Sequence, residues 1–591
     1  MFQTFEATTA PDQGPPRLEA LRTAYKAHGF DGFLIPRADA YQGEYVAPCD
    51  ARLAWLTGFT GSAGFCAVLD EIAGVFVDGR YRVQVKEQVA TTHFTPVDWP
   101  EVKLADWLKE QVKEARIAYD PWLYTKGQIA AVKKGLIGTG ISLHAAPNFV
   151  DQVWSDRPSA PQGKVEFYAL ELSGEKSSDK RARIAEMLRN EKQPAAVLTL
   201  PDSICWLLNI RGTDIPRNPV VHCMAILYDT GKLDLFIDPA KLEGLPPDPN
   251  INALPPASFE AALTQLSGPV RVDRDSAPLA VSRGLKEAGV EIAYAEDPCI
   301  LPKACKNATE IEGARAAHLR DAHAMVNFLA WLDAQPVGSL TEIDVAKALE
   351  GFRADTNALR DISFETISGA NANGAIVHYR VTEDTNAPVD EGLLLVDSGG
   401  QYVDGTTDIT RTIAIGQPTE EQRKCFTLVL QGMIAISRAR FPRGLAGRDL
   451  DALARAPLWA EGMDYDHGTG HGVGAYLSVH EGPQRLSRVS EVALQPGMIL
   501  SNEPGYYREG AFGIRIENLI VVEDAPEAGD KRDQLSFETL TYVPIDRRLI
   551  VTEMLSPAER AWIDAYHAEV ATRLSVSGAT AEWLMQATQP L

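Results

Sequence analysis

The sequence predicts a mixed α/β (α+β) protein of several domains, and three observations lead to this fold class. A chain of 591 residues is too long for one hydrophobic core. Helix-like and strand-like patterns alternate along the chain. One helix-and-strand pattern also occurs twice in the first half, which indicates two related domains of about 150 residues each.

The repeat begins each time with an amphipathic helix and an apolar strand. Residues 17–36, "RLEALRTAYKAHGFDGFLIP", predict a helix that Gly29 ends and a strand that follows it. Residues 179–201, "DKRARIAEMLRNEKQPAAVLTLP", have the same order. A Trp-Leu pair follows at Trp55 in the first copy and at Trp206 in the second, and a pair of strands comes next. We therefore expect two α/β domains of the same type.

One linker lies between these two domains, and a second separates them from the rest of the chain. Residues 155–164 are rich in Pro, Ser and Gly, and residues 296–310 form a second break. After the second break, Thr309 and Glu312 predict a capping box that opens a long helix. The predicted domains are residues 1–160, 161–305 and 306–591.

Composition and charge exclude several classes of protein. The net charge of −23 argues against nucleic-acid binding, because phosphate would be repelled. No apolar run approaches the roughly 18 residues of a membrane span. The start, "MFQTFEATTAPDQGPP", lacks the basic and apolar regions of a secretory signal. The seven cysteines form no CxxC pair and indicate reduced thiols, so we expect a cytoplasmic protein.

A pair of aspartates in the third segment marks a candidate site. Residues 392–416, "GLLLVDSGGQYVDGTTDITRTIAIG", predict a strand that ends at Asp397, a turn at Gly399-Gly400, and a returning strand. The hairpin could bring Asp397 and Asp408 together, where they would repel one another unless a proton or a cation lay between them. Taken alone, the pattern fits structural turn aspartates as well.

Two further acids lie in similar settings. Glu503 follows a short apolar strand in "LQPGMILSNEPGYY". Glu517 lies within "FGIRIENLIVV", a strand pattern in which a buried acid is costly unless it is paired, here with a cation such as Arg515. One such acid would need only a salt bridge. Four acids in one segment, near a histidine cluster, suggest a common cause.

A dinuclear metal site explains the four acids together with the histidines of "DHGTGHGVGAYLSVHEG". Four carboxylates carry a charge of −4, which two divalent ions would neutralise. One imidazole among oxygen ligands, without a thiolate, favours manganese, iron, cobalt or zinc over calcium. A phosphate-binding loop is the alternative for "HGTGHGVG", but no Lys-Ser/Thr follows it.

These motifs resemble a known family. "DSGGQYVDGTTD", "HGTGHGVG", "NEPGYY" and "GIRIEN" are similar to the motifs of the pita-bread metallopeptidases (M24B), and most similar to those of the three-domain aminopeptidase P branch. "EYVAPCD", "VDGRY" and "ANGAIVHY" also resemble that branch. The resemblance spans almost the whole chain. It implies two creatinase-type N-terminal domains followed by a pita-bread catalytic domain.

The resemblance also implies a role for each acid. Asp397 would bind one metal ion, and His471 would bind the other. Asp408 and Glu517 would bridge the two ions. Glu503 would complete the second site and act as the catalytic acid and base.

Further residues match the substrate positions of the family. The non-ligand histidines, expected to hold the substrate carbonyl and stabilise the tetrahedral intermediate, are His378, His467 and His480. Tyr507 and Arg515 match positions that support the ligands and the substrate. For Arg80, in the first domain, the resemblance implies contact with a substrate, which could be bound in the other subunit of a homodimer.

The activity that the resemblance implies is hydrolysis of the N-terminal Xaa-Pro bond of peptides with proline in second position. The proline nitrogen belongs to a tertiary amide without an N–H, which a shaped pocket can recognise. Manganese is the expected metal, with cobalt or zinc as alternatives. Three other functions are a prolidase-type dipeptidase, a creatinase-like hydrolase without metal and a non-catalytic binding protein. The second N-terminal domain argues against the first, and the complete ligand set argues against the other two.

Overall fold

The computed structural model describes residues 1–529 and 531–591 and divides into two compact units. One unit is Thr8–Lys303, and the other combines Met1–Ala7 with Ala304–Leu591. We call the second the catalytic unit, after the domain that the sequence resemblance implies there. None of the described helices is both long and apolar enough to cross a membrane.

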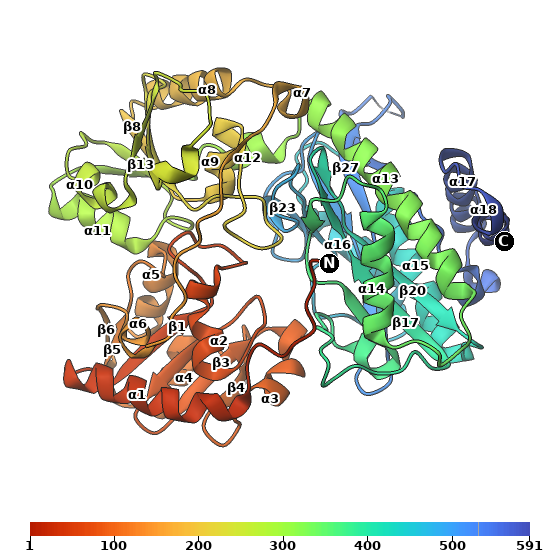
Figure 1. Cartoon of the computed structure of the whole chain (residues 1–591), viewed down its shortest axis with the longest axis horizontal. Helices are drawn as coiled ribbons and strands as arrows, with labels where there is room; N and C mark the ends of the chain where they lie inside the picture. Colours follow the sequence, from red (N-terminus) through yellow and green to blue (C-terminus); the bar gives the residue numbers. More distant parts are fainter. Residues whose placement is uncertain (530) are drawn as a thin grey trace. The chain divides into compact units, whose positions relative to one another are not determined.

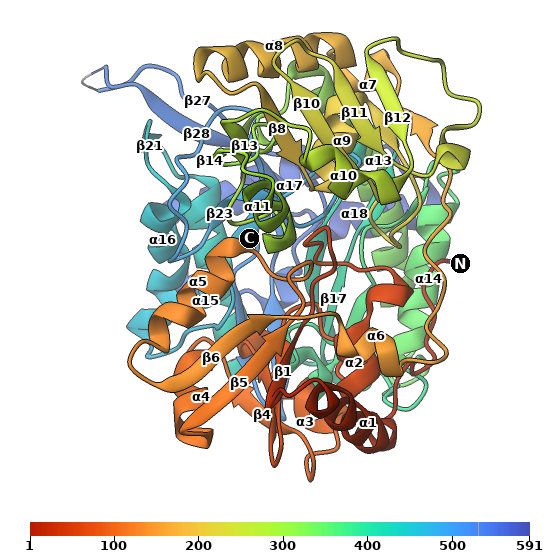
Figure 2. The same ribbon diagram turned by 90° about the vertical axis from the view of Figure 1, so that its left-hand side faces the viewer.

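The first half of Thr8–Lys303 is a six-stranded sheet with helices on both faces (Figure 1). Its central strand β1 (Gly32–Pro36) is antiparallel to β2 and parallel to β5, and Figure 2 shows β1, β5 and β6 side by side. All five residues of β1 are buried, as expected for an apolar strand covered on both faces. The other strands are β2 (Phe65–Leu69), β3 (Ala73–Val77), β4 (Thr95–Asp98), β5 (Glu114–Tyr119) and β6 (Gly140–Ala145). One face of the sheet is covered by α1 (Gly14–Ala27), α2 (Arg52–Thr57) and α6 (Phe149–Val153), and the other by α4 (Leu104–Gln111) and α5 (Lys126–Gly135). The remaining helix is the short α3 (Gln84–Gln88).

The second half repeats this topology strand for strand, which confirms the predicted repeat. The sheet orders are β4-β3-β2-β1-β5-β6 and β12-β11-β10-β8-β13-β14, with the same sequence of parallel and antiparallel pairs. The strands are β8 (Ala195–Leu198), β10 (Met224–Tyr228), β11 (Leu233–Phe236), β12 (Ile251–Leu254), β13 (Val270–Val272) and β14 (Ile292–Tyr294). The helices are α7 (Leu170–Ser173), α8 (Ser177–Asn190), α9 (Pro201–Leu208), α10 (Phe259–Leu263), α11 (Leu279–Glu287) and α12 (Ile300–Ala304), and a two-stranded ribbon joins β7 (Glu166–Phe167) to β9 (Ile210–Arg211).

The catalytic unit contains antiparallel sheets with helices packed against them. Figure 1 shows the long helices α13 (Ala308–Asp333) and α14 (Glu342–Ala354) side by side. The remaining helices are α15 (Glu420–Ser437), α16 (Gly447–Ala460), α17 (Pro557–Arg573) and α18 (Gly578–Ala587). A three-stranded sheet joins β16 (Ile367–Ala370), β17 (Gly392–Ser398) and β20 (Ile409–Ile415), and another joins β15 (Asp361–Ile362), β18 (Gly400–Tyr402) and β19 (Gly405–Thr406). The six-stranded sheet joins β21 (Phe441–Pro442), β28 (Gln534–Thr539), β27 (Asn518–Asp524), β24 (Ile499–Asn502), β22 (Gly470–Gly472) and β23 (Glu481–Leu486), and β25 (Gly505–Arg508) pairs with β26 (Phe512–Arg515).

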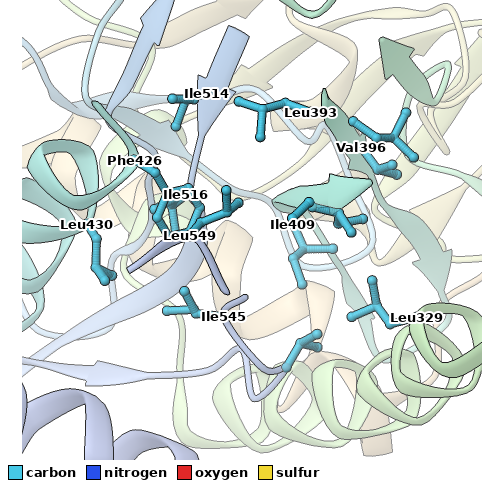
Figure 3. Close-up of a cluster of buried hydrophobic side chains, with 14 of the residues drawn as sticks. Leu329, Leu393, Val396, Ile409, Phe426, Leu430, Ile514, Ile516, Ile545 and Leu549 are labelled. Carbon is cyan, nitrogen blue, oxygen red and sulfur yellow. The ribbon is translucent and has the colours of Figure 1, made fainter. Parts of the chain in front are cut away.

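The largest hydrophobic core of the catalytic unit lies between its helices and these strands. Figure 3 shows Leu329 of α13, Ile409 of β20 and Phe426 of α15 among the side chains of this cluster. Every residue of β17 is buried, so this strand has little freedom to shift. The core therefore fixes the ends of the strands that carry the candidate ligands.

Two local predictions were wrong. The capping box of α13 joins Asn307 and Glu310 rather than Thr309 and Glu312, because Asn is an equally good cap and occurs two residues earlier. The chain also does not reverse at Gly399-Gly400. It continues through β18 and turns between Tyr402 and Gly405.

Gly399 is needed because two backbone segments pass close together, not because the chain turns there. A Cβ atom at this position would lie 1.9 Å from the carbonyl oxygen of Thr407, so only glycine lets the two backbone segments pass. This approach brings the segment before β20 against the end of β17.

Candidate metal centre

Strand ends bring the five predicted ligands to one place in the catalytic unit. They are Asp397 in β17, Asp408 just before β20, His471 in β22, Glu503 just after β24, and Glu517 between β26 and β27. The antiparallel register pairs Asn502 with Asn518, so the positions next to them, Glu503 and Glu517, are neighbours. The Glu517 backbone N–H donates to the carbonyl oxygen of Thr410 at 3.1 Å and so joins the segment before β27 to β20.

Three of these side chains form a group with metal-ligand geometry. Ligand atoms of Asp408, His471 and Glu517 all lie within 4.8 Å of one another. His471 Nε2 lies 3.5 Å from Asp408 Oδ2 and 3.4 Å from Glu503 Oε1. Its Nδ1 is 2.9 Å from the carbonyl oxygen of Gly472, which orients the ring so that Nε2 faces the acids.

Three carboxylates of the group have a buried oxygen without a hydrogen-bond donor. Asp397 Oδ1, Asp408 Oδ1 and Glu517 Oε1 are buried and have no hydrogen-bond partner among the residues that the structure describes. A buried acceptor without a donor is costly, whereas carboxylate oxygens are preferred ligands of hard divalent cations. Burial and the repulsion from neighbouring carboxylates raise the pKa values of Asp408 and Glu517 well above the usual range. The residues therefore fit bound divalent metal.

Two other carboxylate oxygens accept hydrogen bonds from hydroxyl groups. Thr410 Oγ1 donates to Glu517 Oε2 at 2.8 Å, and Ser501 Oγ donates to Glu503 Oε1 at 2.9 Å. Sequence reasoning missed both hydroxyl groups. The sequence could have indicated Ser501, because it lies two residues before Glu503 in an extended segment and so faces the same side.

Arg515 pairs with Asp397 rather than with its neighbour Glu517. Its Nη2 donates to Asp397 Oδ2 at 2.6 Å, and the guanidinium is buried. The sequence pattern suggested Glu517 because a single continuous strand was predicted there. The structure breaks that strand between β26 and β27, and the break turns Glu517 toward Asp408 and Thr410.

Arg515 also connects Asp397 to two candidate substrate-binding residues. Its Nη1 donates to Tyr507 Oη at 2.6 Å, and Tyr507 Oη lies 2.8 Å from His467 Nε2. Burial raises the pKa of Tyr507, so the phenol keeps its proton. The series of hydrogen bonds from Asp397 through Arg515 and Tyr507 to His467 holds the His467 ring at a fixed orientation.

The remaining histidines lie beside the ligands. The His480 ring centroid is 4.3 Å from that of His471 and 6.5 Å from that of His378, whose ring is nearly parallel to His480. The fold thus brings four histidines from two separate stretches of sequence close to the acids.

Arg80 belongs to the other unit, Thr8–Lys303. Its guanidinium pairs with Asp78, with Nη2 2.7 Å from Asp78 Oδ2, a partner that sequence reasoning did not identify. A role for Arg80 in substrate binding stays a prediction.

Family models match nearly the whole chain. The model of metallopeptidase family M24 matches residues 312–524, and the model of the C-terminal region of peptidase M24 matches 533–591. Two models of the creatinase/prolidase N-terminal domain match residues 17–153 and 156–310. The matches occur in the order that the sequence motifs predicted.

Individual relatives match over almost their full length. The probable Xaa-Pro aminopeptidase P of Talaromyces stipitatus is 39% identical, over 97% of this chain and 92% of its own. That of Aspergillus fumigatus is 38% identical, over 100% of this chain and 95% of its own. The crystal structure of X-prolyl aminopeptidase from Caenorhabditis elegans, described as a cytosolic enzyme with a di-nuclear active site, superposes with a TM-score of 0.92 at 32% identity, covering 98% of this chain and 100% of that one. The chain therefore belongs to metallopeptidase family M24, with two creatinase-type N-terminal domains before a pita-bread catalytic domain.

Proposed function

We propose that this protein is a metal-dependent aminopeptidase that hydrolyses the N-terminal Xaa-Pro bond and releases the first residue of peptides with proline in second position. The observation that carries the proposal is the group of four carboxylates and His471, in which three buried carboxylate oxygens have no donor within residues 1–529 and 531–591. Relatives that match over the full chain are named for the same activity.

Five side chains would hold two divalent ions. Asp397 would bind the first ion, His471 and Glu503 the second, and Asp408 and Glu517 would bridge them. When bound, such a pair activates water and polarises the carbonyl that the water attacks. Manganese is the metal we expect, with cobalt or zinc as alternatives, because the donors are oxygens and one imidazole.

The protein's own groups handle protons and charge. Glu503 accepts the proton of the attacking water and delivers it to the proline nitrogen as the C–N bond breaks. Ser501 holds the Glu503 carboxylate in place through its 2.9 Å hydrogen bond. His378 and His480 donate hydrogen bonds to the carbonyl oxygen as negative charge develops on it. His467, held by its hydrogen bond with Tyr507, is the third histidine that we expect to contact the substrate.

The proposal extends to how the enzyme occurs in the cell. We propose a cytoplasmic homodimer, in which Arg80 contacts the substrate. The C. elegans relative is described as cytosolic, and all seven cysteines of this chain are free thiols. Sedimentation equilibrium tests the dimer, because it gives the mass of the species in solution.

Mass spectrometry of two substrates tests the activity. The peptide Arg-Pro-Pro-Gly-Phe and the dipeptide Gly-Pro are incubated with chelated protein and with protein reloaded with manganese. We expect metal-dependent loss of only the first arginine, with slow or no cleavage of the dipeptide. Rapid cleavage of the dipeptide alone would instead indicate a prolidase. An intact pentapeptide in the presence of two bound metals would refute the proposed substrate.

A further inference from the structure

The first seven residues pack on the catalytic unit, although the chain enters the other unit at Thr8. We call Met1–Ala7 the N-terminal strap. The stretch "MFQTFEA" has no periodic pattern, and nothing in the sequence pointed to its contacts. The strap lies against the segment that carries His378, and this contact suggests a role in the active site.

Polar contacts fix the start of the strap. Glu350 of α14 is 4% exposed and accepts hydrogen bonds from the backbone N–H groups of Phe2 and Gln3, the latter at 3.1 Å. The Gln3 amide group bonds the backbone of Thr366 twice, accepting from its N–H at 2.9 Å and donating to its carbonyl oxygen at 3.2 Å. Such paired contacts hold an extended segment at one register.

Phe5 anchors the strap in an apolar cluster. Its side chain is 7% exposed. The cluster contains residues of α14, β16, β17 and the segment after His378, namely Ile343, Ala346, Ile367, Tyr379, Val381 and Leu395. Tyr379 directly follows His378, so Phe5 packs in the same cluster as a neighbour of a proposed catalytic histidine.

Backbone contacts extend the attachment along the same segment. We call residues 376–387 the His378 loop. The Glu383 backbone N–H donates to the carbonyl oxygen of Phe5 at 2.9 Å, and Arg380 donates to that of Thr4 at 3.4 Å. The strap therefore supports the part of the loop that follows His378.

Groups outside the strap also hold the loop. The carbonyl oxygen of Val377, the residue before His378, accepts from Arg515 at 3.3 Å. Glu342 accepts from Tyr379 Oη at 2.9 Å and from the Ala387 N–H at 3.0 Å. A loop without regular secondary structure depends on such contacts for its position.

We propose that the N-terminal strap is a positioning element for His378, with Phe5 as its anchor. It holds the His378 loop so that the imidazole lies beside His480 and is oriented for the substrate carbonyl. This inference rests on the proposed function. Hydrogen bonds to a developing oxyanion act only at a defined geometry, so a mobile loop would lower turnover without affecting the metal ligands.

Phe5→Ala tests the strap, and Phe2→Ala is its matched control. Phe2 is in the same strap, but it is 39% exposed and its backbone N–H contact with Glu350 survives the substitution. The measurements are kcat and KM on the pentapeptide, metal ions per chain, and amide hydrogen exchange of residues 376–387. For Phe5→Ala we expect kcat to fall about 10–100-fold with a smaller change in KM, faster exchange in the His378 loop, and unchanged metal content. Phe2→Ala should match the wild type.

Two further variants separate positioning from misfolding. Phe5→Leu should recover most of the lost turnover because it refills the apolar cluster. Gln3→Ala removes only the two contacts with Thr366 and should shift kcat and loop exchange in the same direction by a smaller factor. Unchanged exchange in Phe5→Ala, or faster exchange with wild-type kcat, would overturn the inference. If the wild type itself fails to cleave the pentapeptide, the proposed function fails, whereas the exchange data still report whether the strap holds the loop.

Discussion

Removing the metal should make the catalytic unit less stable as the pH rises. Asp408 and Glu517 are buried, and burial together with the neighbouring carboxylates raises both pKa values in the folded protein. Below the usual carboxyl range both states hold the proton, so stability is unaffected. Above that range the unfolded chain ionises while the folded protein keeps the proton, and stability falls until the pH passes the raised pKa.

The slope follows from the number of protons retained. Each retained proton lowers the free energy of unfolding by about 1.4 kcal/mol per pH unit. For a unit of roughly 290 residues, this corresponds to a fall of about 2 °C in Tm per pH unit. Saturating metal should reverse the effect, because the ions bind the ionised carboxylates and stabilise only the folded state.

Scanning calorimetry in chelator from about pH 5 to about pH 8 measures this slope. Asp408→Asn should be less dependent on pH than the wild type and more stable at the alkaline end, because a neutral amide replaces one buried acid. Glu553→Gln, at an exposed position, removes the same charge and should behave like the wild type. Identical pH profiles for wild type and Asp408→Asn would refute this reasoning.

Three other substitutions test separate parts of the structure. Arg515→Lys should lower kcat/KM about 10–100-fold, since a single ammonium cannot make the same set of contacts. Steady-state kinetics measure this loss. The control is Arg508→Lys, at an exposed position on the same hairpin, which should leave kcat/KM unchanged. Arg353→Met leaves Asp321 buried without its ion-pair partner and should cost about 3–5 kcal/mol in urea denaturation, so unchanged stability would contradict it. Leu394→Ala removes a fully buried side chain and should cost about 2–5 kcal/mol, and a loss below about 1 kcal/mol would show that the core is not packed as described.

Local pattern was sufficient for most of the elements and for picking out the candidate acids, whereas their assignment as metal ligands came from the family resemblance. The repeat of the first half has the same strand order in both sheets, and the helix and strand periods needed no long-range information. The acids could be found because each lies at an end of a predicted apolar strand or within one, where a buried charge is costly unless it is paired.

Contacts between distant segments could not be predicted in this way. Gly399 looked like a turn residue, but it is required because Thr407 passes close to it in space. Arg515 was paired with its neighbour in sequence, whereas the break between β26 and β27 gives it Asp397. Phe5 contacts residues more than 300 positions away, and the two phenylalanines of the short stretch "MFQTFEA" form no periodic pattern.

The central claim is that the five predicted ligands bind two metal ions and that this pair is required for cleavage of the Xaa-Pro bond. Inductively coupled plasma mass spectrometry of wild type and Asp408→Ala, with the pentapeptide assay on the same samples, tests it most directly. We predict two divalent ions per wild-type chain, and fewer than two with no turnover in Asp408→Ala. Full activity in Asp408→Ala would contradict the account.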